Sequence, residues 1–284
     1  MPFNLPGTLV PLHLIFSPRL VVPSLVVRDI RQLDFYELRK AGYRGAVFDK
    51  DNCLTAPHRD QLVPELTDAW CECREAFGEG NVLIVSNSAG TRVDPGEIQA
   101  ESVTFHLKTP VLRHSVFKPS YSCISSIRKY FSSLPEPIRD DELLVVGDRI
   151  FTDIVMANRM ARRRAVPAPD TARPSGAGKL SEKTHESNAT APTEPPESLR
   201  TPSPRTGPLS IWTNGVWQRE AAAMRFLEKS FMEGVRRYVV ADNGVEVKGG
   251  DVSKFVRPDP IPDEPPKAER VSLVKRLWSR VRRS

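Results

Sequence analysis

The chain has 284 residues, a formal net charge of +6, an apolar content of 39% and 26 prolines. This length allows one large domain or two small ones, and the many prolines with modest apolar content indicate that part of the chain lies outside a packed core. The positive charge favours an anionic partner, which would be a membrane, a nucleic acid or a phosphorylated substrate. No run of 18 apolar residues occurs, so no transmembrane helix is predicted.

The four cysteines are spaced neither as metal ligands nor as a disulfide framework. They therefore predict free thiols in a reducing compartment.

Residues 1–40 are predicted to form an apolar, proline-interrupted arm followed by a short helix that Asp29 can start. Two interpretations of this arm remain open. It packs on the edge of the following domain, or it contacts a membrane.

The apolar run from Ala46 to Phe48 is typical of a buried strand, and two carboxylates, Asp49 and Asp51, follow it directly. Like charges held close raise each other's pKa, and a bound divalent cation removes that cost. One interpretation is a carboxylate nucleophile and a carboxyl acid/base around Mg²⁺. The other is a polar exit from a strand into a turn.

Helix and strand patterns then alternate. A helix is predicted from Pro64, in its first turn, to about Phe77. A buried strand over residues 81–86 ends in Ser86 and Asn87, where hydroxyl and N–H groups can hold an anion, although such residues are also ordinary in loops. Residues 101–107 are predicted as another short strand.

The same alternation continues after a loop that contains Lys118. Ser120 is predicted to cap a helix, and residues 142–146 form a further buried strand. Two more carboxylates, Asp148 and Asp153, follow this strand and precede a helix that runs to about residue 162. A lone lysine in a loop is usually solvated, so Lys118 by itself is weak evidence for a site.

This order of elements predicts an α/β fold with a parallel sheet. In such sheets ligands bind at the carboxyl ends of the strands. The polar residues at or near these ends are Asp49, Asp51, Ser86, Lys118, Asp148 and Asp153.

The second half of the chain changes in composition. Residues 166–208 are rich in proline and poor in large apolar residues, so they are predicted to be a disordered insert. A strand over residues 209–213 and a helix over residues 216–238 are expected to return to the sheet. Residues 246–284 form a linker and a basic tail with an amphipathic pattern.

The tail favours an anionic membrane surface, and the alternatives are a helix packed on the domain or a disordered basic segment. A nucleic-acid partner is not predicted, because no zinc-finger or RNA-binding signature occurs.

In order, Asp49-Lys50-Asp51, Ser86, Lys118 and Gly147-Asp148…Asp153 resemble the four motifs of the haloacid dehalogenase (HAD) superfamily of phosphohydrolases. Residues 48–55, 147–154 and 211–220 are more specifically similar to the fungal mitochondrial phosphatidylglycerophosphate phosphatase family. One departure is that Asn52-Cys53 stands where many HAD enzymes have Gly-Thr.

The resemblance implies a three-layer HAD-like parallel sheet in a domain made of residues 41–165 and 209–245. Only about 30 residues separate Thr55 from Ser86, and the gap from Ser86 to Lys118 is similarly short, which leaves room for a minimal cap or none. An open site suits a bulky substrate.

The resemblance also assigns roles. Asp49 is the nucleophile and Asp51 the acid/base, while Ser86, Asn87 and Lys118 bind the substrate phosphate. Asp49, the Asp51 carbonyl and Asp148 are the implied ligands of Mg²⁺, and Asp153 is either a further ligand or a residue that supports the ligands from behind.

The implied activity is Mg²⁺-dependent hydrolysis of phosphatidylglycerophosphate in cardiolipin biosynthesis. The implied location is mitochondrial, peripheral on the matrix side of the inner membrane, with anionic phospholipid as substrate and partner surface and no protein partner indicated. Two alternatives remain: a HAD phosphatase acting on a soluble or protein phosphomonoester, and a non-catalytic membrane adaptor.

Overall fold

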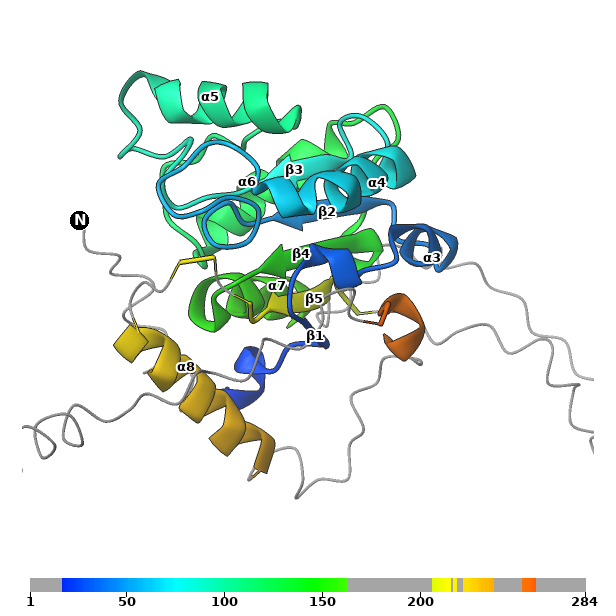
Figure 1. The fold of residues 1–284 in the computed structure, drawn as a ribbon, viewed down its shortest axis with the longest axis vertical. Coiled ribbons are helices and arrows are strands. Elements are labelled where there is room, and N and C mark those ends of the chain that lie inside the picture. The colour runs from blue at the N-terminus through cyan, green and yellow to red at the C-terminus, as the bar shows by residue number, and fades with distance from the viewer. Residues whose placement is uncertain (1–16, 163–205, 216, 219–221, 238–251, 259–284) are drawn as a thin grey trace, which may run out of the picture.

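The computed structural model describes residues 17–162, 206–215, 217–218, 222–237 and 252–258. Within these residues five strands form one sheet in the order β1-β5-β4-β2-β3, and all neighbouring pairs are parallel (Figure 1). The strands are β1 (Leu25–Val27), β2 (Gly45–Phe48), β3 (Val82–Ile84), β4 (Leu143–Gly147) and β5 (Leu209–Thr213). The predicted α/β fold with a parallel sheet is confirmed.

Helices cover both faces of this sheet. They are α3 (Phe35–Lys40), α4 (Thr67–Phe77), α5 (Ile98–Leu107), α6 (Tyr121–Ser132), α7 (Val155–Arg162) and α8 (Ala222–Val235). Side chains of α3, α4 and α5 pack with Ala46 and Phe48 on one face, whereas α6 and α7 pack with Val47 on the other. This alternation along β2 produces three layers, because successive strand residues point to opposite faces.

Two of the helices show how the sequence sets their ends. In α4 the spacing of Trp70, Cys73 and Phe77 places all three in the core, and Gly78, with φ of +87°, ends the helix. In α6 the Ser120 hydroxyl accepts a hydrogen bond from the Cys123 N–H at 3.2 Å, which confirms the predicted cap.

The prediction of a strand over residues 101–107 is wrong, because these residues belong to α5. The helix buries Ala100, Val103 and Leu107, which are spaced three and four residues apart, and leaves Phe105 66% exposed. Helical spacing of the apolar residues therefore decides the structure here.

The two predicted flanking segments contribute more to the domain than expected. Residues 25–27, placed by the sequence in an N-terminal arm, form the edge strand β1 beside β5. Residues 252–258, placed in a linker, dock on the domain through buried Phe255 and through Arg257, which binds Glu72 at 2.7 and 2.8 Å. Residues 1–16 of the predicted arm, nearly all of the insert and the basic tail lie outside the described residues.

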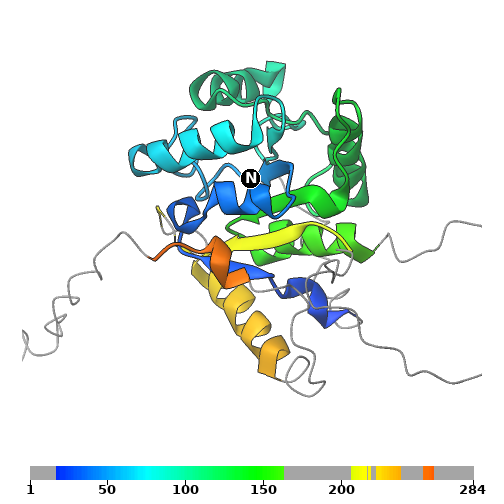
Figure 2. The same ribbon diagram turned by 90° about the vertical axis from the view of Figure 1, so that its right-hand side faces the viewer.

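The last helix, α8, is shorter than the predicted range of 216–238. Its side chains Met232 and Val235 pack with Leu20, Ile154 and Trp212 in a small core of their own. Figures 1 and 2 show α8 and α5 at opposite ends of the molecule, with the sheet between them.

Candidate active site

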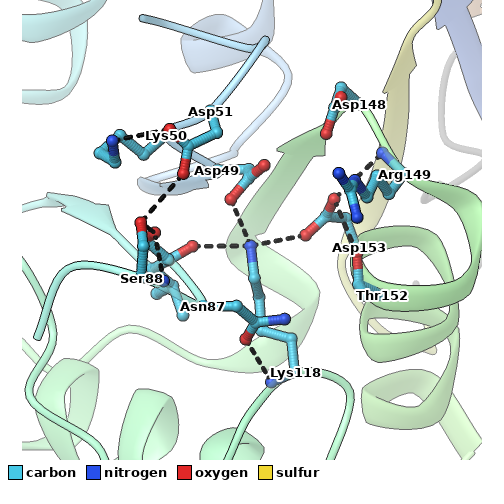
Figure 3. A network of polar contacts seen from close by, with 12 residues as sticks. Asp49, Lys50, Asp51, Asn87, Ser88, Lys118, Asp148, Arg149, Thr152 and Asp153 are labelled. Carbon is cyan, nitrogen blue, oxygen red and sulfur yellow. Dashed lines mark hydrogen bonds and ion pairs between the residues drawn. The ribbon is translucent and has the colours of Figure 1, made fainter. Parts of the chain in front are cut away.

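The carboxyl ends of β2, β3 and β4 meet at one edge of the sheet, and polar side chains from each gather there (Figure 3). Lys118 lies at the centre of this group. Its ammonium is 2.5 Å from Asp49 Oδ1, 2.8 Å from Asp153 Oδ1 and 2.7 Å from the Val85 carbonyl oxygen. Lys118 thus joins the motifs that follow three different strands.

Lys118 is buried, with a side chain only 2% exposed. Burial alone would lower the pKa of its ammonium, but attraction to Asp153 and Asp49 outweighs burial and raises the pKa. The side-chain oxygen of Asn87 fixes the backbone by accepting a hydrogen bond from the Lys118 N–H at 2.7 Å. Lys118 is therefore a permanently charged, fixed neighbour of Asp49.

Three carboxylates, those of Asp49, Asp148 and Asp153, each offer an oxygen within 4.8 Å of the others. Asp153 is held by the Thr152 hydroxyl and the Arg149 N–H, both 3.2 Å from its Oδ2. The glycine of this motif is required by packing, since a Cβ on Gly147 would lie 2.4 Å from Asp153 Cγ. A side chain at that position would push Asp153 out of the group.

Asp148 is the most buried of the three carboxylates. Burial raises its pKa well above the ordinary value, and repulsion from Asp49 and Asp153 adds to this, while Arg225 of α8 opposes it through an ion pair with Oδ2. The other oxygen, Oδ1, is buried without a hydrogen-bond partner in the described structure. Such an atom is costly unless it binds something.

Asp51 stands apart from this trio and has its own partners. Its Oδ1 accepts hydrogen bonds from Lys50 Nζ at 2.7 Å and from the His58 N–H at 3.1 Å, and its Oδ2 accepts one from the Ser88 hydroxyl at 3.0 Å. Lys50 is completely buried, whereas the Asp51 side chain is 31% exposed. Asp51 is thus a firmly oriented carboxylate that solvent and substrate can reach.

Ser86 is fully buried and belongs to the network of Asp51. Its hydroxyl accepts a hydrogen bond from the Ser88 N–H at 3.0 Å and lies 2.9 Å from the Ser88 hydroxyl. Its carbonyl oxygen lies 2.9 Å from His114 Nε2. The segment after β3 is therefore held against Asp51 on one side and against the loop before Lys118 on the other.

The departure at Asn52-Cys53 has a structural reason. Asn52 has φ of +59°, a left-handed conformation that asparagine tolerates better than other residues with side chains. Its side-chain oxygen also accepts a hydrogen bond from the Gln218 N–H at 3.1 Å, a contact that glycine could not make. Burial first, and then the charges of Asp49, Asp148 and Asp153, raise the pKa of the Cys53 thiol, so Cys53 is a neutral core residue.

Comparison with known proteins places this site in a family. The family model of mitochondrial phosphatidylglycerophosphate (PGP) phosphatases matches residues 5–165, more than half of the 284 residues. The chain belongs to the mitochondrial PGP phosphatase family.

Named relatives agree with this assignment. The chain is 40% identical over 159 residues to the mitochondrial phosphatidylglycerophosphatase of Saccharomyces cerevisiae, a match that covers 55% of this chain and 83% of that protein. It is 33% identical over 172 residues to a probable mitochondrial phosphatidylglycerophosphatase of Schizosaccharomyces pombe, covering 56% and 80%. It is also 39% identical over 140 residues to the chloroplastic/mitochondrial phosphatidylglycerophosphate phosphatase 1 of Arabidopsis thaliana, covering 49% and 38%. No solved structure matches the chain.

In this member of the PGP phosphatase family, the structure brings all the residues that the sequence singled out to one edge of the sheet. They are Asp49, Asp51, Ser86, Asn87, Lys118, Asp148 and Asp153. The sequence reasoning missed Lys50, Ser88 and Arg225. The lysine between the two aspartates and the second serine after β3 were visible in the motifs, but no local pattern marks Arg225, which comes from α8.

Proposed function

We propose that this protein hydrolyses phosphatidylglycerophosphate to phosphatidylglycerol and phosphate, on the route to cardiolipin. The observation that carries the proposal is the position of Asp49, held by Lys118 and facing Asp148 and Asp153 at the carboxyl edge of the sheet. Membership of the PGP phosphatase family supports the choice of substrate.

In the proposed reaction, an Asp49 carboxylate oxygen attacks phosphorus and displaces the lipid alkoxide, which leaves an aspartyl-phosphate. Asp51 gives a proton to the departing alkoxide and then takes one from the water that hydrolyses the intermediate. That second step releases phosphate and restores the Asp49 carboxylate. Lys118 keeps Asp49 in position and offsets negative charge on the phosphate.

The hydroxyl and amide side chains that follow β3 are suited to orient Asp51 and to bind the phosphate. Ser88 and Lys50 hold the Asp51 carboxyl between them, so that its proton transfers are made from a fixed position. Ser86 and Asn87 come from the same segment and are proposed to bind the phosphate, with Asn87 also holding the Lys118 backbone.

The acidic trio fits Mg²⁺, which prefers carboxylate and carbonyl oxygens. Its three oxygens converge within 4.8 Å, and the partnerless Oδ1 of Asp148 is a ready ligand atom. Asp49, Asp148 and Asp153 would hold the ion, together with the backbone carbonyl of Asp51. When bound, Mg²⁺ would offset the repulsion between the carboxylate nucleophile and the phosphate.

The surroundings of the site suit a bulky substrate. Residues 49–118, which the structure describes without a gap, contain α4 and α5 and no further domain that could close over Asp49. No helix among the described residues has the length and apolar character to cross a bilayer. The mitochondrial relatives support a mitochondrial location, and we propose a peripheral position on the matrix side of the inner membrane.

The test is phosphate release by the full chain from phosphatidylglycerophosphate in detergent micelles, compared with small phosphate esters and phosphopeptides. We expect Mg²⁺-dependent release that is fastest with the lipid, and almost none from the Asp49→Asn variant, which should still fold because Lys118 keeps its ion pair with Asp153. Near-normal turnover by Asp49→Asn would refute the nucleophile. Faster release from phosphopeptides would refute the lipid substrate, and no release from any compound would indicate a non-catalytic adaptor.

A further inference from the structure

Helix α8 has two sides of different character. On the inner side Glu228, Met232 and Val235 are buried against the domain, and Arg225 reaches the site as the ion-pair partner of Asp148.

The outer side of α8 carries large apolar side chains in solvent. Met224 is 47% exposed, Phe226 72% and Leu227 58%, and these three residues are called here the apolar face of α8. Isolated exposed apolar residues are normal on a protein surface. Three within four consecutive positions of one helix, next to a residue that contacts the site, form a patch that calls for an explanation.

The charge on this helix identifies the kind of partner. Lys229 is exposed two residues beyond the apolar face, and exposed Arg236 and Arg237 directly follow the end of α8. Among the exposed residues of this stretch only Glu233 is acidic, and it lies 3.4 Å from Arg237. Apolar side chains combined with basic ones are the pattern by which a helix lies in the interface of an anionic bilayer.

We propose that the apolar face of α8 docks the protein on a bilayer that contains anionic lipid, and so delivers the headgroup phosphate to Asp49. This inference rests on the proposed function. Arg225 precedes Phe226 and pairs with Asp148, so the helix that carries the apolar face also contacts the acidic trio. Apolar side chains of such helices enter the headgroup boundary by about 5–10 Å, which would hold the site beside the membrane surface.

A second protein copy is a poorer occupant of this face. A specific protein–protein interface needs about 800 Å² from each partner, and three side chains of one helix supply only part of that area. Exposed basic residues of two copies would also repel each other, whereas an anionic surface attracts them.

The experiment measures binding of the full chain to sedimented phosphatidylcholine vesicles, with and without phosphatidylglycerol and with no phosphatase substrate. We expect the double variant Phe226→Ser/Leu227→Ser to bind the phosphatidylglycerol vesicles at least about tenfold more weakly than wild type. The matched control is Phe105→Ser, which removes a 66% exposed phenylalanine from α5 at the other end of the molecule (Figures 1 and 2) and should bind as wild type does.

Activity assays separate docking from chemistry. The double variant should hydrolyse a small soluble phosphate ester at the wild-type rate, but should lose hydrolysis of phosphatidylglycerophosphate in vesicles in proportion to binding. If wild type fails to hydrolyse the lipid in micelles while the double variant still loses vesicle binding, the proposed function fails and the docking surface stands.

Three outcomes would overturn the inference. The double variant could bind vesicles as wild type does, or Phe105→Ser could lose binding equally. Light scattering could also show that wild type is a dimer that the double variant disrupts, which would make the apolar face an interface between copies.

Discussion

Removing the charge of Lys118 should destabilise the whole domain, because this ammonium forms ion pairs with two buried carboxylates at once. Lys118→Met keeps the length of the side chain but leaves Asp49 and Asp153 facing each other without a cation. Breaking a buried ion pair by removing one partner typically costs about 3–5 kcal/mol. Since both partners of Lys118 are nearly buried, we expect a loss in that range without divalent cations.

The pH dependence of this loss follows from the raised pKa of Lys118. A lysine whose pKa is higher in the folded protein contributes its full stability below the unfolded value of about 10.4, and loses it only as the pH rises through the folded value. Titration of Lys118 itself should therefore add no pH dependence to the difference between wild type and Lys118→Met from about pH 6 to 9.

Urea unfolding of both proteins, with EDTA and with excess Mg²⁺, measures this effect. Mg²⁺ should stabilise Lys118→Met more than wild type, because the cation takes over part of the missing charge. The control is Lys40→Met, whose ion pair with Glu37 is exposed to solvent and should contribute far less to stability. Equal unfolding free energies for Lys118→Met and Lys40→Met in EDTA would refute this account of the site.

Three further predictions concern other parts of the same edge. Asn52→Ala should lower the unfolding free energy by about 1–3 kcal/mol, and Asn52→Gly by less, because glycine keeps the left-handed backbone and loses only the bond to Gln218. Gly147→Ala should weaken Mg²⁺ binding about 10–100-fold in calorimetric titration by displacing Asp153, and unchanged binding would contradict the packing argument. Burial raises the pKa of Glu228 from 4.5 to about 7, so the contribution of Glu228 to stability in EDTA should fall by about 3 kcal/mol as the pH rises from 4.5 to 8. Glu228→Gln should remove most of that dependence and be more stable than wild type at pH 8; a parallel pH profile for the two proteins would count against a buried, protonated Glu228.

The strands and the residues that follow them could be predicted because their signals are local. A short apolar run such as Ala46 to Phe48, followed at once by turn residues, is typical of a buried strand, and polar residues directly after it then lie at the strand end. Parallel pairing then brings Asp49 and Asp148 to the same edge without further information. The helix capped by Ser120 was equally local.

Other features depend on contacts that no local pattern reveals. Arg225 meets Asp148 across 77 residues, and Gln218 meets Asn52 across 166. Both pairs join motif loops to the segment that follows the predicted insert. The sequence indicated a strand and a helix in that segment, but it did not reveal that the segment contacts the site. The strand prediction for residues 101–107 was wrong for a different reason. Their short apolar pattern fits the period of a strand as well as that of a helix until the burial of the neighbouring residues is known.

The chemistry proposed for this site needs two carboxylates with different behaviour, although Asp49 and Asp51 are only two residues apart. The structure separates them because β2 ends at Phe48 and the chain turns immediately afterwards. Asp49 is left in the buried acidic trio, paired with Lys118, where a nucleophile can be aimed and its charge offset.

Asp51 is turned away from that trio and is held instead by Lys50 and Ser88 in a partly exposed position. A group that must exchange protons with a leaving alkoxide and with water needs that access. The buried Lys50 between the two aspartates supports the separation that the proposed chemistry needs, because its ammonium donates a hydrogen bond that fixes Asp51. An acid/base carboxyl that shared the trio with Asp49 would instead compete for the same cations.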